Sequence, residues 1–193
     1  MARTESTMLE LGTEIPSFSL PDVVSGRTVS PGDYKDAKAL VVMFICNHCP
    51  YVQRIREGLA ALGRDFESKP VGVLAISSND AVNYPDDSPE KMKEEATAFA
   101  YAFPYLFDEN QEVAKAFRAA CTPEFYVFDG DGKLAYRGQF DRARPGNNEP
   151  VTGGDVRAAI EAVLSGAPVS SEQTPSVGCN IKWRPGNAPD YFG

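Results

Sequence analysis

Long apolar runs and dense clusters of basic residues are both missing from this chain of 193 residues. Its longest candidate for an apolar run, residues 39–45, falls far short of the roughly 18 residues that a membrane-spanning helix needs. Lys and Arg together number 19 against 27 Asp and Glu, so the formal net charge is -8. Nucleic acids and anionic membranes bind clustered positive charge, and the sequence therefore predicts neither of them as a partner.

Internal repeats and low-complexity tracts are also absent. The first residues include Glu5, where a secretory signal would carry basic and then apolar residues, so we expect a cytoplasmic protein. At roughly 150 residues per domain, the length predicts one domain over residues 1–165, followed by a Pro-, Gly- and Ser-rich tail over residues 166–193. The tail holds Trp183, the only tryptophan, and is expected to pack over the domain.

Hydrophobic periodicity predicts the order of the helices and strands. Apolar runs at residues 39–45 and 71–76 are typical of strands that are buried on both faces. Apolar residues at helical spacing over residues 50–66 and 89–103 predict amphipathic helices. The Asp-Gly-Asp-Gly segment at residues 129–132 separates two strand-like segments and predicts a hairpin. The resulting order is βαβαβαββα.

This order predicts an α/β fold. Two crossovers from strand to helix to strand predict parallel pairs in the middle of the sheet, and the closing hairpin predicts an antiparallel edge. A short N-terminal hairpin within residues 15–29 is expected to add to an edge. We therefore expect a mixed central sheet flanked by helices on both faces.

Cysteine is scarce, and its placement is uneven. Cys46 and Cys49 form a C-x-x-C pair, whereas Cys121 and Cys179 stand alone in the sequence. The cytoplasm keeps ordinary thiols reduced, and a domain of this size needs no disulfide to fold. The pair is therefore more typical of catalytic or metal-binding cysteines than of a structural disulfide, while Cys121 is expected to pack in the core.

The pair lies where a buried strand ends and a helix begins. Unpaired N–H groups and the dipole at the start of a helix favour an anion, so Cys46 is expected to have a pKa below the ordinary value of roughly 8.5 and to act as the nucleophile. Cys49, one turn further on, is expected to be less exposed, to have the higher pKa and to resolve the mixed disulfide that Cys46 forms.

His48, between the two cysteines, is the only histidine. It can donate to the Cys46 sulfur or place positive charge beside it, which favours the thiolate and makes the pair more oxidising. Chance packing and half of a zinc site are the alternatives, but zinc normally takes four ligands and the other two thiols are remote in sequence. We therefore predict a redox pair without a metal and without an organic cofactor.

Four segments of the sequence carry a resemblance to a known family. Residues 44–52, 79–92, 122–124 and 178–183 resemble bacterial thioredoxin-like proteins described as thiol-disulfide isomerases or as peroxiredoxin-like redoxins of the AhpC/TSA type. The resemblance covers nearly the whole chain. It implies a thioredoxin fold and a dithiol–disulfide activity centred on the cysteine pair.

The resemblance also implies roles for Thr122 and Pro123. Pro123 is expected to follow a cis peptide bond that turns the Thr122 backbone toward the cysteines, where it can pair with an extended substrate. Thioredoxins proper carry a buried acid in the strand before the active site, and residues 39–45 contain none. By analogy Glu124 is a candidate for that general base, with a solvated strand residue as the alternative.

Three functions remain open at this point. The preferred one is thiol–disulfide oxidoreduction on disulfides of proteins or small molecules, with a thiol reductant that restores the pair. The second is a thiol peroxidase in which Cys46 becomes a sulfenic acid and Cys49 or Cys179 condenses with it. True peroxiredoxins have a Thr three residues before the reactive Cys, and Met43 stands there. The third is a redox-gated binding module, in which oxidation of the cysteines releases the C-terminal tail.

Two further segments have structural interpretations. Cys179 is either a third redox thiol or an anchor of the tail, and the sequence does not separate the two. The acidic residues around residues 86–90 precede a predicted helix, and we interpret them as capping residues rather than as a cation site.

Overall fold

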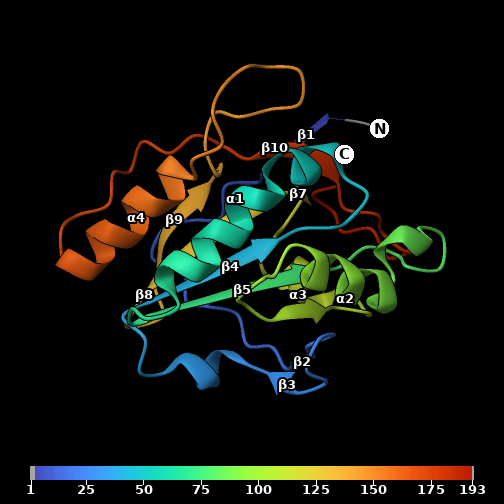
Figure 1. Ribbon diagram of the computed structural model, residues 1–193, viewed down its shortest axis with the longest axis horizontal. Coiled ribbons are helices and arrows are strands. Elements are labelled where there is room, and N and C mark those ends of the chain that lie inside the picture. Colours follow the sequence, from blue (N-terminus) through green and yellow to red (C-terminus); the bar gives the residue numbers. More distant parts are fainter. Residues whose placement is uncertain (1–2, 193) are drawn as a thin grey trace.

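A five-stranded mixed sheet forms the centre of the computed structural model, which describes residues 3–192 (Figure 1). The strand order is β6-β5-β4-β8-β9. β4 pairs parallel with β5, and β5 pairs parallel with β6, whereas β8 pairs antiparallel with both β4 and β9. The predicted parallel middle and antiparallel edge are confirmed. The strands are β4 Ala39–Phe44, β5 Val71–Ser77, β6 Tyr105–Phe107, β8 Glu124–Asp129 and β9 Leu134–Gly138.

Helices cover both faces of this sheet, as the α/β prediction requires. α1, α2 and α4 pack on one face, and α3 packs on the other together with the N-terminal segment. The helices are α1 Pro50–Phe66, α2 Pro89–Ala98, α3 Glu112–Ala116 and α4 Gly154–Ser165, with two short 3-10 helices, η1 Pro31–Tyr34 and η2 Pro85–Asp87. Within residues 3–192, no helix has the length and apolar content to cross a bilayer.

β4 shows why the sheet must be covered on both sides. All six of its residues are buried. Because successive side chains of a strand point to opposite faces, Val41 and Met43 enter the core beneath α1, whereas Val42 and Phe44 enter the core beneath α3. A strand of this composition is stable only between two apolar layers.

The N-terminal hairpin is present but shorter than predicted. Its strands are β2 Leu20–Pro21 and β3 Thr28–Val29, and Asp22 bridges Leu106 at the β6 edge of the central sheet. The expected strand from residue 15 to residue 20 does not form over its full length. Pro16 lacks the N–H group that a paired strand donates, which is consistent with this difference.

The C-terminal tail forms a strand, which the sequence did not predict. β10 Val177–Asn180 lies between β1 Arg3–Glu5 and β7 Cys121–Thr122 in a second, three-stranded sheet. Figure 1 shows this sheet at the end of the molecule where α1 begins. The tail thus contributes a strand to this sheet, and Trp183 packs against the core beneath α3.

Gly178 allows β10 to approach β7 closely. A Cβ atom on Gly178 would lie 1.9 Å from the Thr122 carbonyl oxygen, far inside van der Waals contact. We predict that Gly178→Ala lowers the free energy of unfolding by about 1–3 kcal/mol through overpacking. Urea unfolding of the variant and of the natural protein measures this loss of stability. Gly32→Ala is the matched control, because its Cβ would meet only Ser30 Oγ at 3.6 Å. Equal stability of the two variants would contradict the close approach.

Candidate active site

The two cysteines lie between the end of β4 and the start of α1. Cys49 is the N-cap residue of α1, and Pro50 occupies the first helical turn. Proline favours this position because the N–H that it lacks would have no partner there. The start of the helix therefore belongs to Cys49, whereas Cys46 lies in the preceding loop. Both residues are buried, with 1% and 0% of their surface exposed.

Thr122 contacts both sulfurs from the facing strand. Its hydroxyl lies 3.3 Å from Cys46 Sγ, and its carbonyl oxygen lies 3.2 Å from Cys49 Sγ. The Thr122–Pro123 peptide bond is cis, as the family resemblance implied. The structure thus brings Cys46, Cys49 and Thr122 together although 73 residues or more separate Thr122 from the cysteines.

The expected order of the two cysteine pKa values is wrong. Hydrogen bonds from the thiols of Cys179 and Cys46 lower the pKa of Cys49 to about 2, against the opposing effect of burial. Burial raises the pKa of Cys46 well above its ordinary value, and its contact with Cys49 and the charge of Asp87 act in the same direction. The two thiols therefore titrate as a coupled pair, in which Cys46 holds its proton more tightly than Cys49. The Val52 backbone N–H in the first turn of α1 adds a smaller lowering of the Cys49 pKa.

His48 pairs with Asp87, a residue whose role at the site the sequence analysis missed. His48 Nδ1 lies 2.5 Å from Asp87 Oδ2. This hydrogen bond raises the pKa of His48, although partial burial opposes it. Burial alone would raise the pKa of Asp87, but hydrogen bonds from His48 and Asn79 outweigh it and lower that pKa. The arrangement favours an imidazolium–carboxylate pair.

Asp87 is fully buried and has further hydrogen-bond donors. The backbone N–H groups of Asn47 and His48 donate to its Oδ1 at 2.8 and 3.2 Å, and Asn79 Nδ2 donates to Oδ2 at 2.8 Å. The interpretation of Asp87 as a capping residue is therefore wrong, whereas Ser88 does cap α2. No local pattern reveals a contact that joins residues 39 positions apart.

Glu124 does not reach the cysteine pair. It pairs with Phe44 in the sheet, so its side chain lies on the face that packs beneath α3. Its carboxylate accepts hydrogen bonds from the Ala120 and Cys121 backbone N–H groups and from Tyr126 Oη. Burial raises the pKa of Glu124 to about 7. These contacts do not support the expected role of a general base for Cys49.

Cys179 and Cys121 lie on the two paired strands beside the site. Cys179 in β10 is opposite Thr122, and its thiol contacts the Cys49 sulfur. The Thr122 backbone edge that we expected to receive substrate is therefore occupied by β10. Cys179 anchors the tail, and its redox role stays a prediction. Cys121 is fully buried against Glu124, as expected for a packing residue.

A metal ion would have to displace an existing interaction. Cys46 Sγ, one ring nitrogen of His48 and one carboxylate oxygen of Asp87 lie within 4.8 Å of one another, which is a possible ligand set. However, His48 Nδ1 and Asp87 Oδ2 are 2.5 Å apart, closer than the roughly 3 Å between two ligands of one tetrahedral zinc ion. The residues could hold a metal only after this hydrogen bond breaks.

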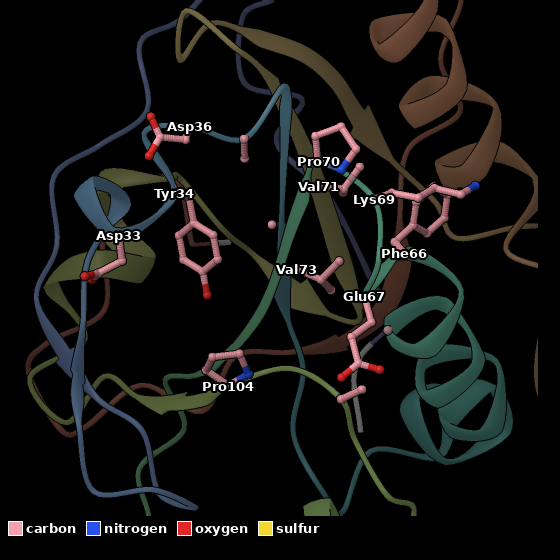
Figure 2. A pocket seen from close by; sticks show the side chains of 14 residues that line it. Asp33, Tyr34, Asp36, Phe66, Glu67, Lys69, Pro70, Val71, Val73 and Pro104 are labelled. Carbon is pink, nitrogen blue, oxygen red and sulfur yellow. The ribbon is translucent and has the colours of Figure 1, made fainter.

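The larger cavities lie away from the cysteines. One of about 360 Å³ opens between η1 and the end of α1, at the opposite end of the sheet. Figure 2 shows Tyr34 on one side of it and Phe66 and Glu67 on the other. Beside Pro123, the space between α1 and the tail measures only about 10 Å³. Val177 of the tail lines this space, so the tail leaves little room next to Pro123.

Comparisons with known proteins agree with this fold. The model of the AhpC/TSA family matches residues 11–137. "Putative peroxiredoxin MT2597" of Mycobacterium tuberculosis is 28% identical over 143 residues, with 68% of this chain and 85% of that protein covered. "Thiol-disulfide oxidoreductase ResA" of Geobacillus thermodenitrificans is 27% identical over 131 residues, with 68% and 70% covered.

Two solved structures are more similar in sequence. An uncharacterized conserved protein from Geobacillus kaustophilus is 53% identical, with a TM-score of 0.93 and with 96% of this chain and 98% of that chain covered. The hypothetical protein SMc02350 from Sinorhizobium meliloti is 49% identical, with a TM-score of 0.93 and with 95% and 100% covered. More distant thioredoxins, such as one from Neisseria meningitidis at 21% identity and a TM-score of 0.62, share the fold.

The raised pKa of Glu124 predicts a pH-dependent stability. The folded protein holds this proton more tightly than the unfolded chain, so the Glu124 contribution to stability falls as pH rises from 4.5 to about 7. Over that interval we expect the free energy of unfolding of Glu124→Gln to rise by about 3 kcal/mol relative to that of the natural protein. Urea unfolding at both pH values measures the difference. Glu57→Gln, on the exposed face of α1, is the control. If the difference in free energy of unfolding between Glu124→Gln and the natural protein did not change with pH, the raised pKa of Glu124 would be contradicted.

Proposed function

The chain belongs to the AhpC/TSA family of thiol-based redoxins, and from that premise we propose that it is a thiol–disulfide oxidoreductase acting through Cys46 and Cys49. The convergence of both sulfurs on Thr122 carries the proposal. The hydrogen bond between the two cysteine side chains supports it, because two thiols in contact can close a disulfide without a large movement.

The first step is an attack on the substrate disulfide R–S–S–R′. Cys46 passes its proton to the Cys49 thiolate as its sulfur attacks. The substrate S–S bond breaks, a bond between Cys46 and the R sulfur forms, and R′S⁻ leaves. This proton transfer follows the hydrogen bond that already joins the two cysteine side chains.

The second step closes the protein's own disulfide. Cys49 loses its proton and attacks the Cys46 sulfur, which forms the Cys46–Cys49 bond and releases the R group as a thiolate. The substrate has gained two electrons and the protein has lost two. A thiol reductant outside the chain returns the pair to the dithiol, so neither a metal nor an organic cofactor is required.

Thr122 and Pro123 are the proposed substrate contacts. An extended substrate pairs with the Thr122 backbone only where that edge is free, and β10 occupies it. Protein substrates therefore require β10 to move away from β7. Small disulfides need less space and are expected to react with the tail in place.

Peroxide reduction is the second candidate function. It is favoured by the 28% identity to a protein named a peroxiredoxin. Cys46 would attack one oxygen of hydrogen peroxide, so that the O–O bond breaks, water leaves and a sulfenic acid forms on Cys46. Cys49 would then condense with it to give the Cys46–Cys49 disulfide and a second water. Met43, fully buried in the core, offers no hydroxyl three residues before Cys46. Thr122 Oγ1, 3.3 Å from Cys46 Sγ, supplies the nearby hydroxyl instead.

Turnover of a small alkyl disulfide and of hydrogen peroxide, each with dithiothreitol as reductant, tests the proposal. We predict disulfide reduction that Cys46→Ser lowers by about 1000-fold or more, because the nucleophile is lost. Cys49→Ser removes both the proton acceptor and the resolving thiol, so the mixed disulfide on Cys46 should form more slowly and then persist, which mass spectrometry of the intact protein detects. Cys121→Ala is the control and should stay within about twofold.

Two outcomes would contradict the proposal. Rapid consumption of peroxide together with negligible reduction of disulfides would favour the peroxidase. Unchanged disulfide turnover in Cys46→Ser would remove both candidates, because each assigns the attack to Cys46.

A further inference from the structure

His48 carries a ring nitrogen that the resting site does not use. Its Nδ1 is engaged by Asp87, but its Nε2 is buried and has no hydrogen-bond partner within residues 3–192. A buried polar atom without a partner is destabilising, because it has lost its hydrogen bonds to water. Such an atom next to a reactive pair is typical of a site that awaits a group from a substrate.

The His48 ring is close to the reacting sulfurs and is fixed in orientation. One of its nitrogens belongs to the group of atoms that lies within 4.8 Å of Cys46 Sγ. The ring stacks on Tyr84, with centroids 5.6 Å apart and an angle of 12° between the planes. Asp87 holds the opposite edge of the ring through the 2.5 Å contact to Nδ1. The remaining N–H is therefore presented from a rigid imidazole.

The support of Asp87 comes from segments far apart in the chain. Asn79 donates to Asp87 and accepts a hydrogen bond from the Lys182 backbone N–H at 2.8 Å, so the tail fixes Asn79. On the other side, Asn47 is held by Tyr105 Oη at 3.1 Å. These contacts hold the Asp87 carboxylate against one edge of the His48 imidazole and prevent the carboxylate from rotating away.

We propose that Asp87 is a positioning residue that keeps His48 protonated, so that Nε2–H protonates the sulfur that leaves when Cys46 attacks a disulfide. This rests on the proposed thiol–disulfide function and deepens it. Cys46 and the R sulfur form a bond, the substrate S–S bond breaks, and the His48 proton converts R′S⁻ to R′SH. The neutral imidazole then receives the proton that Cys49 releases in the second step. The site therefore suits disulfides whose leaving thiolates are strong bases, namely alkyl disulfides.

All charged or titratable groups around His48 bear on this assignment. Asp87 favours the imidazolium, and a thiolate on Cys49 acts in the same direction. The Lys182 ammonium opposes it from the tail. Cys46 is neutral in the resting pair because its pKa is raised. Asp87 makes the direct hydrogen bond to the ring, so its effect exceeds that of Lys182.

The experiment compares two substrates, a dialkyl disulfide and an aromatic disulfide whose leaving thiolate is a weak base. Both need the same attacking sulfur, so the ratio of their rates cancels the ionisation of the cysteine pair. Only the alkyl thiolate is a strong enough base to need a proton from His48 as it leaves. In the natural protein the ratio of alkyl to aromatic rate should fall as pH rises through the His48 pKa.

Asp87→Asn removes the carboxylate, and Asp86→Asn is the matched control. Asp86 is the adjacent residue of η2, and its side chain is exposed. We expect Asp87→Asn to lower the rate ratio about 10- to 100-fold at pH 7 and to move its decline to lower pH, because His48 loses its proton sooner. The ratio for Asp86→Asn should stay within about twofold of the natural protein.

His48→Gln keeps Asp87 in place and decides the result if Asp87→Asn does not fold. Glutamine can donate a hydrogen bond but cannot transfer a proton, so the ratio should be low and independent of pH. An unchanged ratio in His48→Gln, or equal ratios in Asp87→Asn and Asp86→Asn, would overturn the inference in a protein that still reduces both disulfides. Absence of reduction of either disulfide by the natural protein would overturn the proposed function as well.

Discussion

The contact of Thr122 with both cysteine sulfurs is the interaction on which the rest of the site depends. Its hydroxyl faces Cys46, its carbonyl faces Cys49, and its backbone pairs with Cys179 in β10. One residue thus joins the reactive loop, the facing strand and the tail. Because Gly178 has no side chain, β10 can approach Thr122 closely enough to complete this arrangement. The tail is therefore part of the site rather than an appendage to the domain.

Charge at the site is balanced within a small volume. A buried carboxylate is costly unless donors satisfy it, and Asp87 has such donors on the reactive loop and on Asn79. The same carboxylate keeps positive charge on His48, close to the sulfur that must accept or release electrons. A stabilised Cys49 thiolate favours the reduced form of the pair, which makes the couple more oxidising than an ordinary dithiol. Local electrostatics thereby act on both the protonation of the site and the reduction potential of the pair.

Much of the fold could be predicted from the sequence, because each element has a local cause. The apolar run of β4, the amphipathic pattern of α1 and the Asp-Gly turn before β9 depend only on neighbouring residues. The cis bond at Pro123 came from the family resemblance and not from the composition of the strand. The cysteine pair stood out because its spacing is itself a chemical pattern.

The features that escaped prediction all arise from tertiary contacts. Asp87 meets His48 across 39 residues, and β10 pairs with a strand more than 50 residues earlier. The two cysteine pKa values depend on burial, on the contact between the two thiols and on a third thiol contributed by the tail. Glu124 lies on the opposite face of the sheet because of its register with Phe44. Chain-local patterns contain none of this information.

The most direct test of the account is a titration of the purified protein in glutathione redox buffers, with free thiols trapped by alkylation and each cysteine peptide measured by mass spectrometry. The account predicts one two-electron transition confined to Cys46 and Cys49, with Cys121 and Cys179 alkylated throughout. A disulfide between Cys179 and either member of the pair as the first oxidised form, or a pair that stays reduced until peroxide is added, would contradict it.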